Sequence, residues 1–289
     1  MVMNRADAFD TAVFKEMMRA EYRSAAAGWR RWHDVLEAEE GGKLHSSKLV
    51  ELAKIGSGDA VLDVAGGYGE PSITAARLVG PSGRVVCTDI SGGMFAFGQE
   101  RVAEAGLDNV EFVERDAEQL NFEDGSFDAV LSRAGLMFLP DVAGTLKQLH
   151  SFLKPGGRLA ASVWGPPTVQ VTTAMPIVFA ELKLPPPPPG RPGIFALADP
   201  DMLAAFVVDA GFHDVETGTI RVIFETDTPE QFTEFVQDLA PTITELVDEQ
   251  PPEVQERIRR KVTEAWTQFQ DAGGRVRTEN QSIWVVGTK

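Results

Sequence analysis

The feature that most constrains the fold of this chain is an alternation of short apolar runs with helical segments between residues 60 and 163. The apolar runs are residues 60–64, 84–88, 110–113, 127–131 and 158–163, each of strand length. Helical segments over 72–78, 94–105 and 142–153 separate most of them. Because parallel strands need long crossover connections, this order predicts a parallel sheet covered by helices on both faces.

Further helical patterns flank this alternation on both sides. Upstream, residues 9–55 carry apolar side chains at helical spacing, with a break at Gly41 and Gly42. Downstream, the pattern predicts helices over 175–182, 199–211 and 229–272, and strands over 215–224 and 283–286. Pro185 to Pro189 predict an extended polyproline segment. No internal repeat is present, so we expect a single domain with attached helical elements.

Residues 61–72, VLDVAGGYGEPS, combine a strand, a glycine-rich turn and a helix start. Glycines allow a backbone to approach a ligand closely at a helix N-terminus. A dinucleotide fingerprint would need Gly or Ala where this chain has Ser72, and Glu70 would repel a pyrophosphate. The turn therefore argues against a dehydrogenase, and Asp63 and Glu70 favour a cationic ligand.

Two more acids follow the next two predicted strands. Asp89 ends the second strand, about 20 residues beyond the glycine turn, where a carboxylate accepts hydrogen bonds from ribose hydroxyls. Asp116 follows the third strand, and with Ala117 it is suited to bind the edge of an adenine ring. Three acids at successive strand ends predict a nucleoside cofactor.

With these motifs, residues 50–164 resemble the class I S-adenosylmethionine-dependent methyltransferases. The resemblance also rests on TDIS at 88–91, DAE at 116–118, FEDGSFD at 122–128 and LKPGGR at 153–158. The DVAGGYG form of the turn is most similar to the ubiquinone and menaquinone biosynthesis C-methyltransferases and related small-molecule enzymes. The resemblance implies a Rossmann-like, doubly wound α/β fold whose seven-stranded sheet has its last strand, 283–286, antiparallel beside the fifth. It also implies a helical N-terminal lid at 1–56, a core at 57–166, and a cap completing the sheet at 167–289.

The resemblance further implies S-adenosyl-L-methionine as cofactor and S-adenosyl-L-homocysteine as product. In the family pattern Asp63 and Gly67 shape the methionine pocket, and the backbone of Ser132 faces the amino group. Asp89 holds the ribose, and Met94 packs on the adenine. The full set of implied cofactor-binding residues is Asp63, Ala65, Gly67, Asp89, Ile90, Met94, Asp116, Ala117 and Ser132.

The acceptor pocket is expected beyond the fourth and fifth strands and beneath the N-terminal helices. Its candidate residues are Tyr22, Trp29, Arg133, Met137, Phe138 and Trp164. Such a lining predicts a small apolar or aromatic acceptor, methylated on carbon or oxygen. O- or N-methylation of a polar natural product stays open, as does S-adenosylmethionine binding without transfer. His33 and His45 are the candidate catalytic residues, and an ordinary structural role competes with catalysis for both.

Net charge and residue composition limit the kinds of molecule that this protein is expected to bind. The formal charge of −16 disfavours nucleic acid and anionic lipid. We expect Cys87 in the core and no metal site, since the chain has one Cys and four scattered His. We also expect a cytoplasmic protein, because no apolar run reaches membrane-spanning length and no signal peptide is evident. The expected partner is a small-molecule acceptor, and a homodimer stays open. The acidic residues Glu37, Glu39 and Glu40 are expected at the solvated surface.

Overall fold

The computed structural model describes residues 9–166, 169–185 and 190–289. Four helical segments precede the sheet: α1 (Thr11–Arg31), α2 (His33–Leu36), the π-helical turn η1 (Glu39–Lys43) and α3 (Leu44–Leu52). The predicted break is confirmed, because Gly41 adopts φ −102° and ψ −122°, which no helix allows. The side chain of Asp10 accepts hydrogen bonds from the first backbone N–H groups of α1, which fixes where this helix begins.

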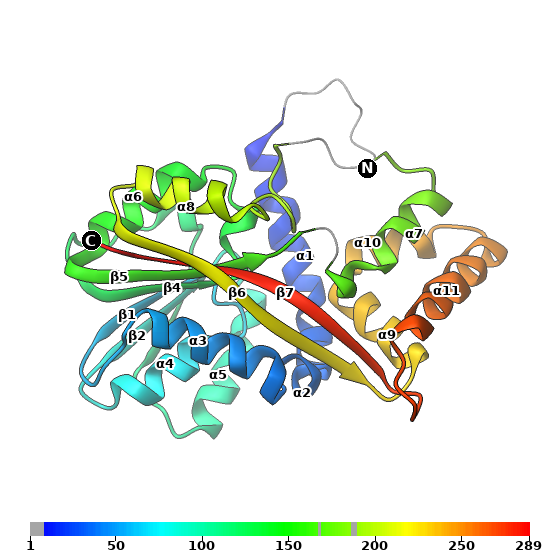
Figure 1. Ribbon diagram of the computed structural model, residues 1–289, viewed down its shortest axis with the longest axis horizontal. Coiled ribbons are helices and arrows are strands. Elements are labelled where there is room, and N and C mark those ends of the chain that lie inside the picture. The colour runs from blue at the N-terminus through cyan, green and yellow to red at the C-terminus, as the bar shows by residue number, and fades with distance from the viewer. Residues whose placement is uncertain (1–8, 167–168, 186–189) are drawn as a thin grey trace.

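Seven strands form one sheet in the order β3-β2-β1-β4-β5-β7-β6 (Figure 1). They are β1 (Ala60–Val64), β2 (Arg84–Asp89), β3 (Val110–Glu114), β4 (Phe127–Arg133), β5 (Leu153–Trp164), β6 (His213–Thr226) and β7 (Val276–Thr288). Strands β1 to β5 pair in parallel, and β7 pairs antiparallel with β5 and with β6. The predicted antiparallel last strand beside the fifth is therefore confirmed.

Helices cover both faces of the sheet (Figure 1). The two layers are α3, α4 (Ser72–Val79) and α5 (Phe95–Glu104) on one face, and α6 (Val142–Phe152) and α8 (Pro200–Asp209) on the other. Neighbouring residues of β1 point to opposite layers: Val61 packs with residues of α3 and α4, and Leu62 packs with residues of α6 and α8. This double burial explains why the strands are apolar almost throughout.

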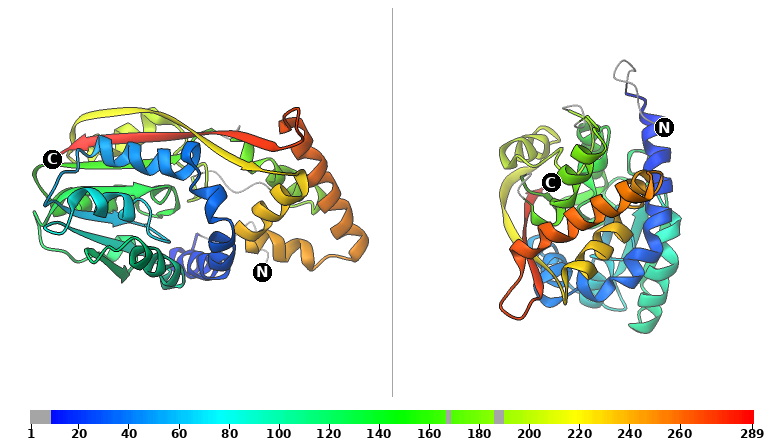
Figure 2. Two further views of the ribbon diagram at one scale, coloured as in Figure 1. Left: turned by 90° about the horizontal axis from the view of Figure 1, so that it is seen from below. Right: turned by 90° about the vertical axis from the view of Figure 1, so that its right-hand side faces the viewer.

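Beyond the sheet, β6 and β7 continue as a long two-stranded ribbon toward a separate group of helices (Figure 2). That group, which we call the cap, comprises α7 (Ala174–Glu181), α9 (Pro229–Leu239), α10 (Pro241–Asp248) and α11 (Pro252–Trp266). The predicted helical segment 229–272 is thus three helices and a final 3-10 turn, η6 (Thr267–Phe269), because prolines begin each helix. The cap has its own core, which includes Phe232, Phe235 and Trp266.

Two further expectations concern the polyproline segment and membrane-spanning helices. Most of the expected polyproline segment, residues 186–189, lies outside the described residues. Among the helices in the described part of the chain, none is both long and apolar enough to cross a membrane.

Candidate functional site

A cavity of about 620 Å³ lies at the carboxyl ends of the parallel strands, between the sheet and the helices α1, α9 and α10. Its first part, which we call the loop end, is lined by Ala65, Gly66, Gly67, Asp89, Ile90, Met94, Asp116 and Ala117. Its second part, which we call the chamber, is lined by Met17, Met18, Tyr22, Trp29, Met137, Phe138, Trp164, Ile194, Leu239 and Ile243. Ligands of open α/β sheets bind at this edge.

The glycine-rich turn brings its backbone to the wall of the loop end. Ala65 has φ 59° and Gly67 has φ 53°, in the left-handed region. At Gly66, a Cβ atom would lie 2.5 Å from Cys87 Sγ and 2.7 Å from Asp63 Oδ2. A side chain at residue 66 would collide with the interior behind the turn, so this tight turn requires glycine there.

Asp89 is fixed by the turn on one side and by its own loop on the other. Its Oδ2 accepts a hydrogen bond from the Gly67 N–H at 3.0 Å, and its Oδ1 accepts one from the Ser91 N–H at 2.8 Å. Burial raises the pKa of this carboxyl to about 6. Each oxygen keeps a second lone pair, so the carboxylate can still accept two hydroxyl groups from a ligand.

Asp63 and Ser132 lie directly behind the cavity wall and do not line it. Asp63 Oδ2 accepts hydrogen bonds from the Ser72 N–H at 3.0 Å and from the Ser72 hydroxyl at 2.6 Å, which caps α4. Burial raises the pKa of Asp63 to about 7. Among the described residues, Asp63 Oδ1 and Ser132 Oγ are buried without a hydrogen-bond partner. Both residues can therefore act on a ligand through the loops that they support.

The far side of the loop end includes a residue that the sequence did not predict. Lys15 of α1 donates to Asp116 Oδ2 at 2.7 Å and to Glu118 Oε2 at 2.5 Å. The other Asp116 oxygen accepts from the backbone N–H of Glu118 at 2.9 Å. Helix α1 is thereby tied to the strand-end loop. No motif in the sequence indicates this contact between residues 101 positions apart.

The two candidate histidines differ in their position relative to the cavity. His45 lines the cavity, whereas His33 lies outside its lining, with its ring 5.4 Å from the ring of Phe97. His45 Nε2 lies 2.7 Å from the Ser162 hydroxyl and 3.1 Å from the Ser282 hydroxyl. Burial, with the positive charge of Arg133 as a second cause, lowers the pKa of His45 to about 3. His45 is thus a neutral side chain held by two serines.

Arg133 lines the cavity as predicted and anchors a buried ionic network. Its guanidinium donates to Glu37 Oε1 at 2.7 Å, to the Tyr68 hydroxyl at 2.8 Å and to the Ser46 hydroxyl at 3.0 Å. The Tyr68 hydroxyl in turn donates to Glu37. Burial alone would raise the pKa of Glu37, but Arg133 lowers it below its ordinary value.

The expectation that Glu37 lies at the solvated surface is wrong. Its exposed fraction is 4%, whereas its neighbours Glu39 and Glu40 are exposed as expected. The acidic run hid this difference, because the chain turns at residues 39–43 and points only Glu37 toward Arg133. An apolar residue directly before Glu37, the buried Leu36, was the one local signal of an inward face.

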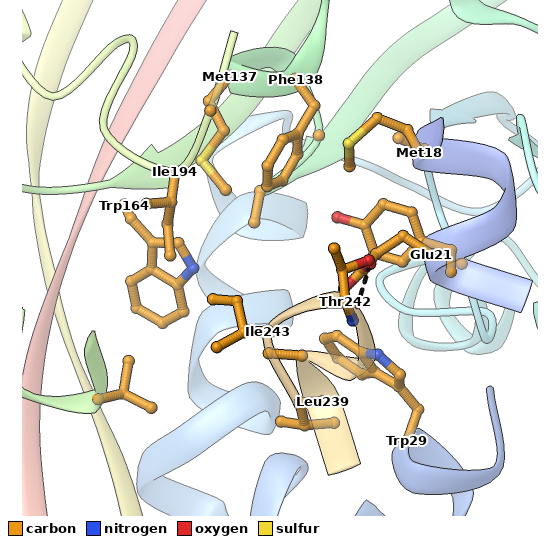
Figure 3. Close-up of a pocket in the computed structure, with 18 of the residues that line it drawn as sticks. Met18, Glu21, Trp29, Met137, Phe138, Trp164, Ile194, Leu239, Thr242 and Ile243 are labelled. Atoms are coloured by element: carbon orange, nitrogen blue, oxygen red, sulfur yellow. Dashed lines mark hydrogen bonds between the residues drawn. The ribbon is translucent and has the colours of Figure 1, made fainter. Parts of the chain in front are cut away.

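The remaining predicted pocket residues come together in the chamber. Figure 3 shows Met18, Trp29, Phe138, Trp164 and Ile243 arranged around it. The ring of Tyr22 meets the ring of Phe138 at 6.1 Å, edge to face. Sequence reasoning missed the contributions of the cap, in particular Leu239, Thr242 and Ile243. In the described ranges, no three His, Cys, Asp or Glu side chains gather as a metal site would need.

Comparison with known proteins places this geometry in a family. Residues 21–180 match the ubiE/COQ5 methyltransferase family, which is more than half of the chain. The chain belongs to this family. It is 34% identical over 222 residues to the ubiquinone/menaquinone biosynthesis C-methyltransferase UbiE of Pseudomonas putida (strain W619), covering 70% of this chain and 85% of that relative.

Similarity to other UbiE proteins is confined to a shorter segment. The chain is 37% identical over 156 residues to UbiE of Pseudomonas fluorescens (strain SBW25), covering 53% of this chain. The matched segment spans 60% of that relative's own length.

Solved structures share the fold of this family member at low sequence identity. The [4+2]-cyclase SpnF aligns with a TM-score of 0.61 and 17% identity, over 94% of this chain and 95% of that one. Haemonchus contortus phosphoethanolamine N-methyltransferase 2, in complex with S-adenosyl-L-methionine, aligns with a TM-score of 0.58 and 16% identity, over 99% of this chain and 61% of that one. These similarities support the fold, and a shared fold does not specify the acceptor molecule.

Proposed function

We propose that this protein transfers the methyl group of S-adenosyl-L-methionine to a small, apolar, quinone-like ring and releases S-adenosyl-L-homocysteine. One observation carries the proposal: a single cavity joins the loop end to the chamber. A nucleoside cofactor and an apolar acceptor can therefore meet without crossing solvent. Membership of the ubiE/COQ5 family and similarity to UbiE proteins of Pseudomonas support the same reaction class.

The residues of the loop end fit S-adenosylmethionine. The buried oxygens Asp63 Oδ1 and Ser132 Oγ, unpartnered among the described residues, stand behind the turn where a cationic methionine end would lie. The turn at Ala65, Gly66 and Gly67 lines the cavity, so its backbone can lie close to the cofactor. Asp89 would hold the ribose hydroxyls, and Asp116 with Ala117 would bind the adenine edge. Ile90 and Met94, which line the same wall, would pack against the adenine ring.

The chemistry that the bound sulfonium supplies is an activated methyl group with a neutral thioether as leaving group. The protein then has to hold the acceptor in line with that methyl group, at about 3–3.5 Å. The side chains of Met137, Phe138 and Trp164 are placed to pack on an acceptor ring and to exclude water from the reacting atoms. Similarity to UbiE proteins, which are named C-methyltransferases, favours methylation of a carbon atom.

We also propose a cytoplasmic site of action and no nucleic-acid partner. The formal charge of −16 supports the absence of nucleic acid, because like charges repel a phosphate backbone. The single, fully buried Cys87 is consistent with a reducing compartment.

The first test is calorimetric titration of the protein with S-adenosylmethionine, S-adenosylhomocysteine and NADH. We expect micromolar binding of the first two, no binding of NADH, and a loss of at least tenfold in Asp89→Ala. The protein is then incubated with S-adenosylmethionine and short-chain 1,4-benzo- and 1,4-naphthohydroquinones, and methylated products are measured by mass spectrometry. Binding of NADH alone would overturn the cofactor assignment. Cofactor binding without methylation of any hydroquinone, phenol or amine would leave a binding protein.

A further inference from the structure

The carboxylates around the cavity differ in whether a neighbouring group already neutralises them. The cavity is lined by Glu21, Glu37, Glu70, Asp89 and Asp116. Arginine or lysine side chains pair with three of these, Glu37, Glu70 and Asp116, at 2.7–2.8 Å. Asp89 receives two backbone N–H groups and faces the expected ribose site. Of these five cavity-lining carboxylates, Glu21 is therefore the one outside the expected cofactor site for which the described residues supply no paired cationic side chain.

Glu21 projects from α1 toward the chamber, where the acceptor is expected. Figure 3 shows it beside Thr242, with Met18 on one side and Trp29 on the other. The backbone N–H of Thr242, at the start of α10, donates to Glu21 Oε2 at 3.2 Å and also reaches Oε1 at 3.5 Å. This bond orients the carboxylate and leaves most of its lone pairs available to a ligand.

The groups around Glu21 favour proton uptake. Burial raises the pKa of Glu21 above its ordinary value, and the negative charge of Glu245 on α10 acts in the same direction, against the Thr242 hydrogen bond. On α1, the neighbouring Tyr22 is also uncharged, because burial raises the pKa of its hydroxyl. On α9, Asp238 is held by Arg31 and by the indole N–H of Trp32. Glu245 on α10 therefore favours protonation of Glu21, whereas the charge of Asp238 is already neutralised by Arg31.

We propose that Glu21 is the catalytic base of the transfer, receiving the proton of a hydroxyl group on the acceptor ring. This inference rests on the proposed function and adds the base that it lacked. The pKa of His45 is lowered to about 3, so its imidazole is a weak base, and its Nε2 already contacts two serine hydroxyls. Glu21 is half-buried, and its raised pKa makes it a stronger base than a fully exposed glutamate.

The step balances without a further reactant. The O–H bond of the acceptor breaks, its electron pair stays on oxygen, and the proton forms an O–H bond with the Glu21 carboxylate. The ring carbon ortho to that oxygen then forms a C–C bond to the methyl group, and the S–C bond breaks with its electron pair going to sulfur. The proton on the methylated carbon then moves to the ring oxygen, which restores both the aromatic ring and the hydroxyl group. The proton held by Glu21 leaves to water when the product is released, so each transfer releases one proton.

The position of Glu21 also narrows the acceptor class. Most of the chamber wall is apolar, so a carboxylate there is best matched by a neutral hydroxyl donor on an apolar body. An acceptor carrying a carboxylate or phosphate beside its reacting ring would be repelled by Glu21. The structure therefore favours phenols and hydroquinones over anionic natural products.

The decisive variant is Glu21→Gln, because glutamine keeps the shape and the acceptor oxygen for the Thr242 N–H but cannot act as a base. With 1,4-naphthohydroquinone as probe, we expect kcat to fall about 10²- to 10⁴-fold. Calorimetric affinity for S-adenosylhomocysteine should stay within about twofold. The wild-type rate should rise with pH along an acidic limb that the variant lacks. A kcat within about threefold of wild type, with the limb retained, would overturn the inference and leave the methyltransferase proposal standing.

Glu245→Gln is the matched control, since Glu245 is an exposed carboxylate on α10 outside the cavity lining. It should keep its maximal rate and shift the acidic limb to lower pH, because one negative charge near Glu21 is removed. A limb unmoved by Glu245→Gln and by Glu21→Gln would assign the titration to another group and contradict the role of Glu21.

A binding measurement separates failure of this inference from failure of the proposed function. The protein loaded with S-adenosylhomocysteine is titrated with 1-naphthol and with its methyl ether. We expect wild type and Glu21→Gln to prefer the naphthol by about tenfold, and Glu21→Ala to lose that preference. Equal affinity for both probes in wild type would contradict the placement of Glu21 at the acceptor hydroxyl. Cofactor binding with no transfer to any hydroquinone would overturn the function itself, and the base with it.

Discussion

The two ends of the cavity are built by different parts of the chain. The loop end is lined mainly by short segments that follow β1, β2 and β3, so its residues come in chain order from one repeating arrangement. The chamber needs α1 against the cap, whose contacts join residues such as Arg31 and Asp238, 207 positions apart. The comparison teaches that a local motif can specify cofactor chemistry, whereas acceptor chemistry depends on long-range packing. Variants should therefore affect the two ends separately, except where a residue joins them.

Arg133 joins the two ends, and removing it should give the largest effect. Arg133→Met would leave the buried Glu37 carboxylate without its cation, at a cost of about 3–5 kcal/mol in the free energy of unfolding. Urea unfolding at pH 7 measures this. Affinity for S-adenosylhomocysteine and for the acceptor should fall together, because Glu37 and Tyr68 lose their common partner.

The double variant Arg133→Met with Glu37→Met should recover much of that loss, since no buried charge remains from this ion pair. Arg31→Met serves as the control, because Arg31 makes its ion pairs at the surface and should leave the unfolding midpoint nearly unchanged. A single variant no less stable than wild type would show that the buried network is not required.

Gly28→Val should disturb the chamber and spare the loop end. A Cβ atom at Gly28 would lie 2.3 Å from the backbone oxygen of Asp238, so α1 and α9 would have to move apart. We expect about 1–3 kcal/mol of destabilisation from overpacking and at least tenfold weaker acceptor binding. Affinity for S-adenosylhomocysteine should stay within about twofold by calorimetry. Ala27→Val, at the exposed neighbouring position, controls for the β-branched side chain.

The pH dependence of cofactor binding should report on the loop end. Burial raises the pKa of Asp89 to about 6, so this carboxyl loses its charge below that pH and with it part of its capacity to accept ribose hydroxyls. We expect the Kd for S-adenosylhomocysteine to rise about tenfold between pH 7.5 and 5, and Asp89→Asn to give a flatter profile.

The stability of the protein without cofactor should change in the opposite direction. A raised pKa means that the folded state binds the proton more tightly than the unfolded state. The stability conferred by protonated Asp89 is therefore present near pH 4 and is lost as the pH rises through about 6. A tenfold difference in proton affinity between the two states corresponds to about 1.4 kcal/mol. Thermal unfolding of wild type and Asp89→Asn across this range would reveal the difference, and parallel curves would contradict it.

Lys15→Met should have the smallest effect. Lys15 ties α1 to Asp116 and Glu118 through ion pairs whose side chains are only 10–15% exposed, so their contribution to stability should lie near the upper end of the range for surface pairs, about 1 kcal/mol. We expect S-adenosylhomocysteine to dissociate about threefold faster, measured by stopped-flow fluorescence. Lys48→Met on α3, which removes a more exposed ion pair away from the cavity, should leave the rate unchanged.

The sequence predicted the sheet well because its signals are local. Asp89 is the last residue of β2 and Asp116 lies two residues after β3, so strand boundaries alone place them at one edge. The antiparallel final strand came from the resemblance, and the structure confirms it.

The chamber could not be predicted in the same way. Glu21 and Thr242 carry no shared pattern, and their contact exists only because α1 packs against α9 and α10. Glu37 was misassigned for the same reason, because an acidic run gives no sign of a distant arginine. Side chains whose role depends on a partner over 90 positions away leave no periodic trace in the sequence.

The ribbon of β6 and β7 has a mechanical consequence. Its ladder runs without a loop from Thr288, paired with β5 in the sheet, to Val276, paired with Thr226 beside the cap. The cap is therefore attached to the sheet by a continuous antiparallel ladder and not by a flexible linker. Moving the cap away from the sheet would require bending this hydrogen-bonded ladder along its length. Helix α1, in contrast, is held by side-chain contacts and is not part of this ladder. We therefore expect ligands to enter and leave by displacement of α1, while the cap stays fixed relative to the sheet.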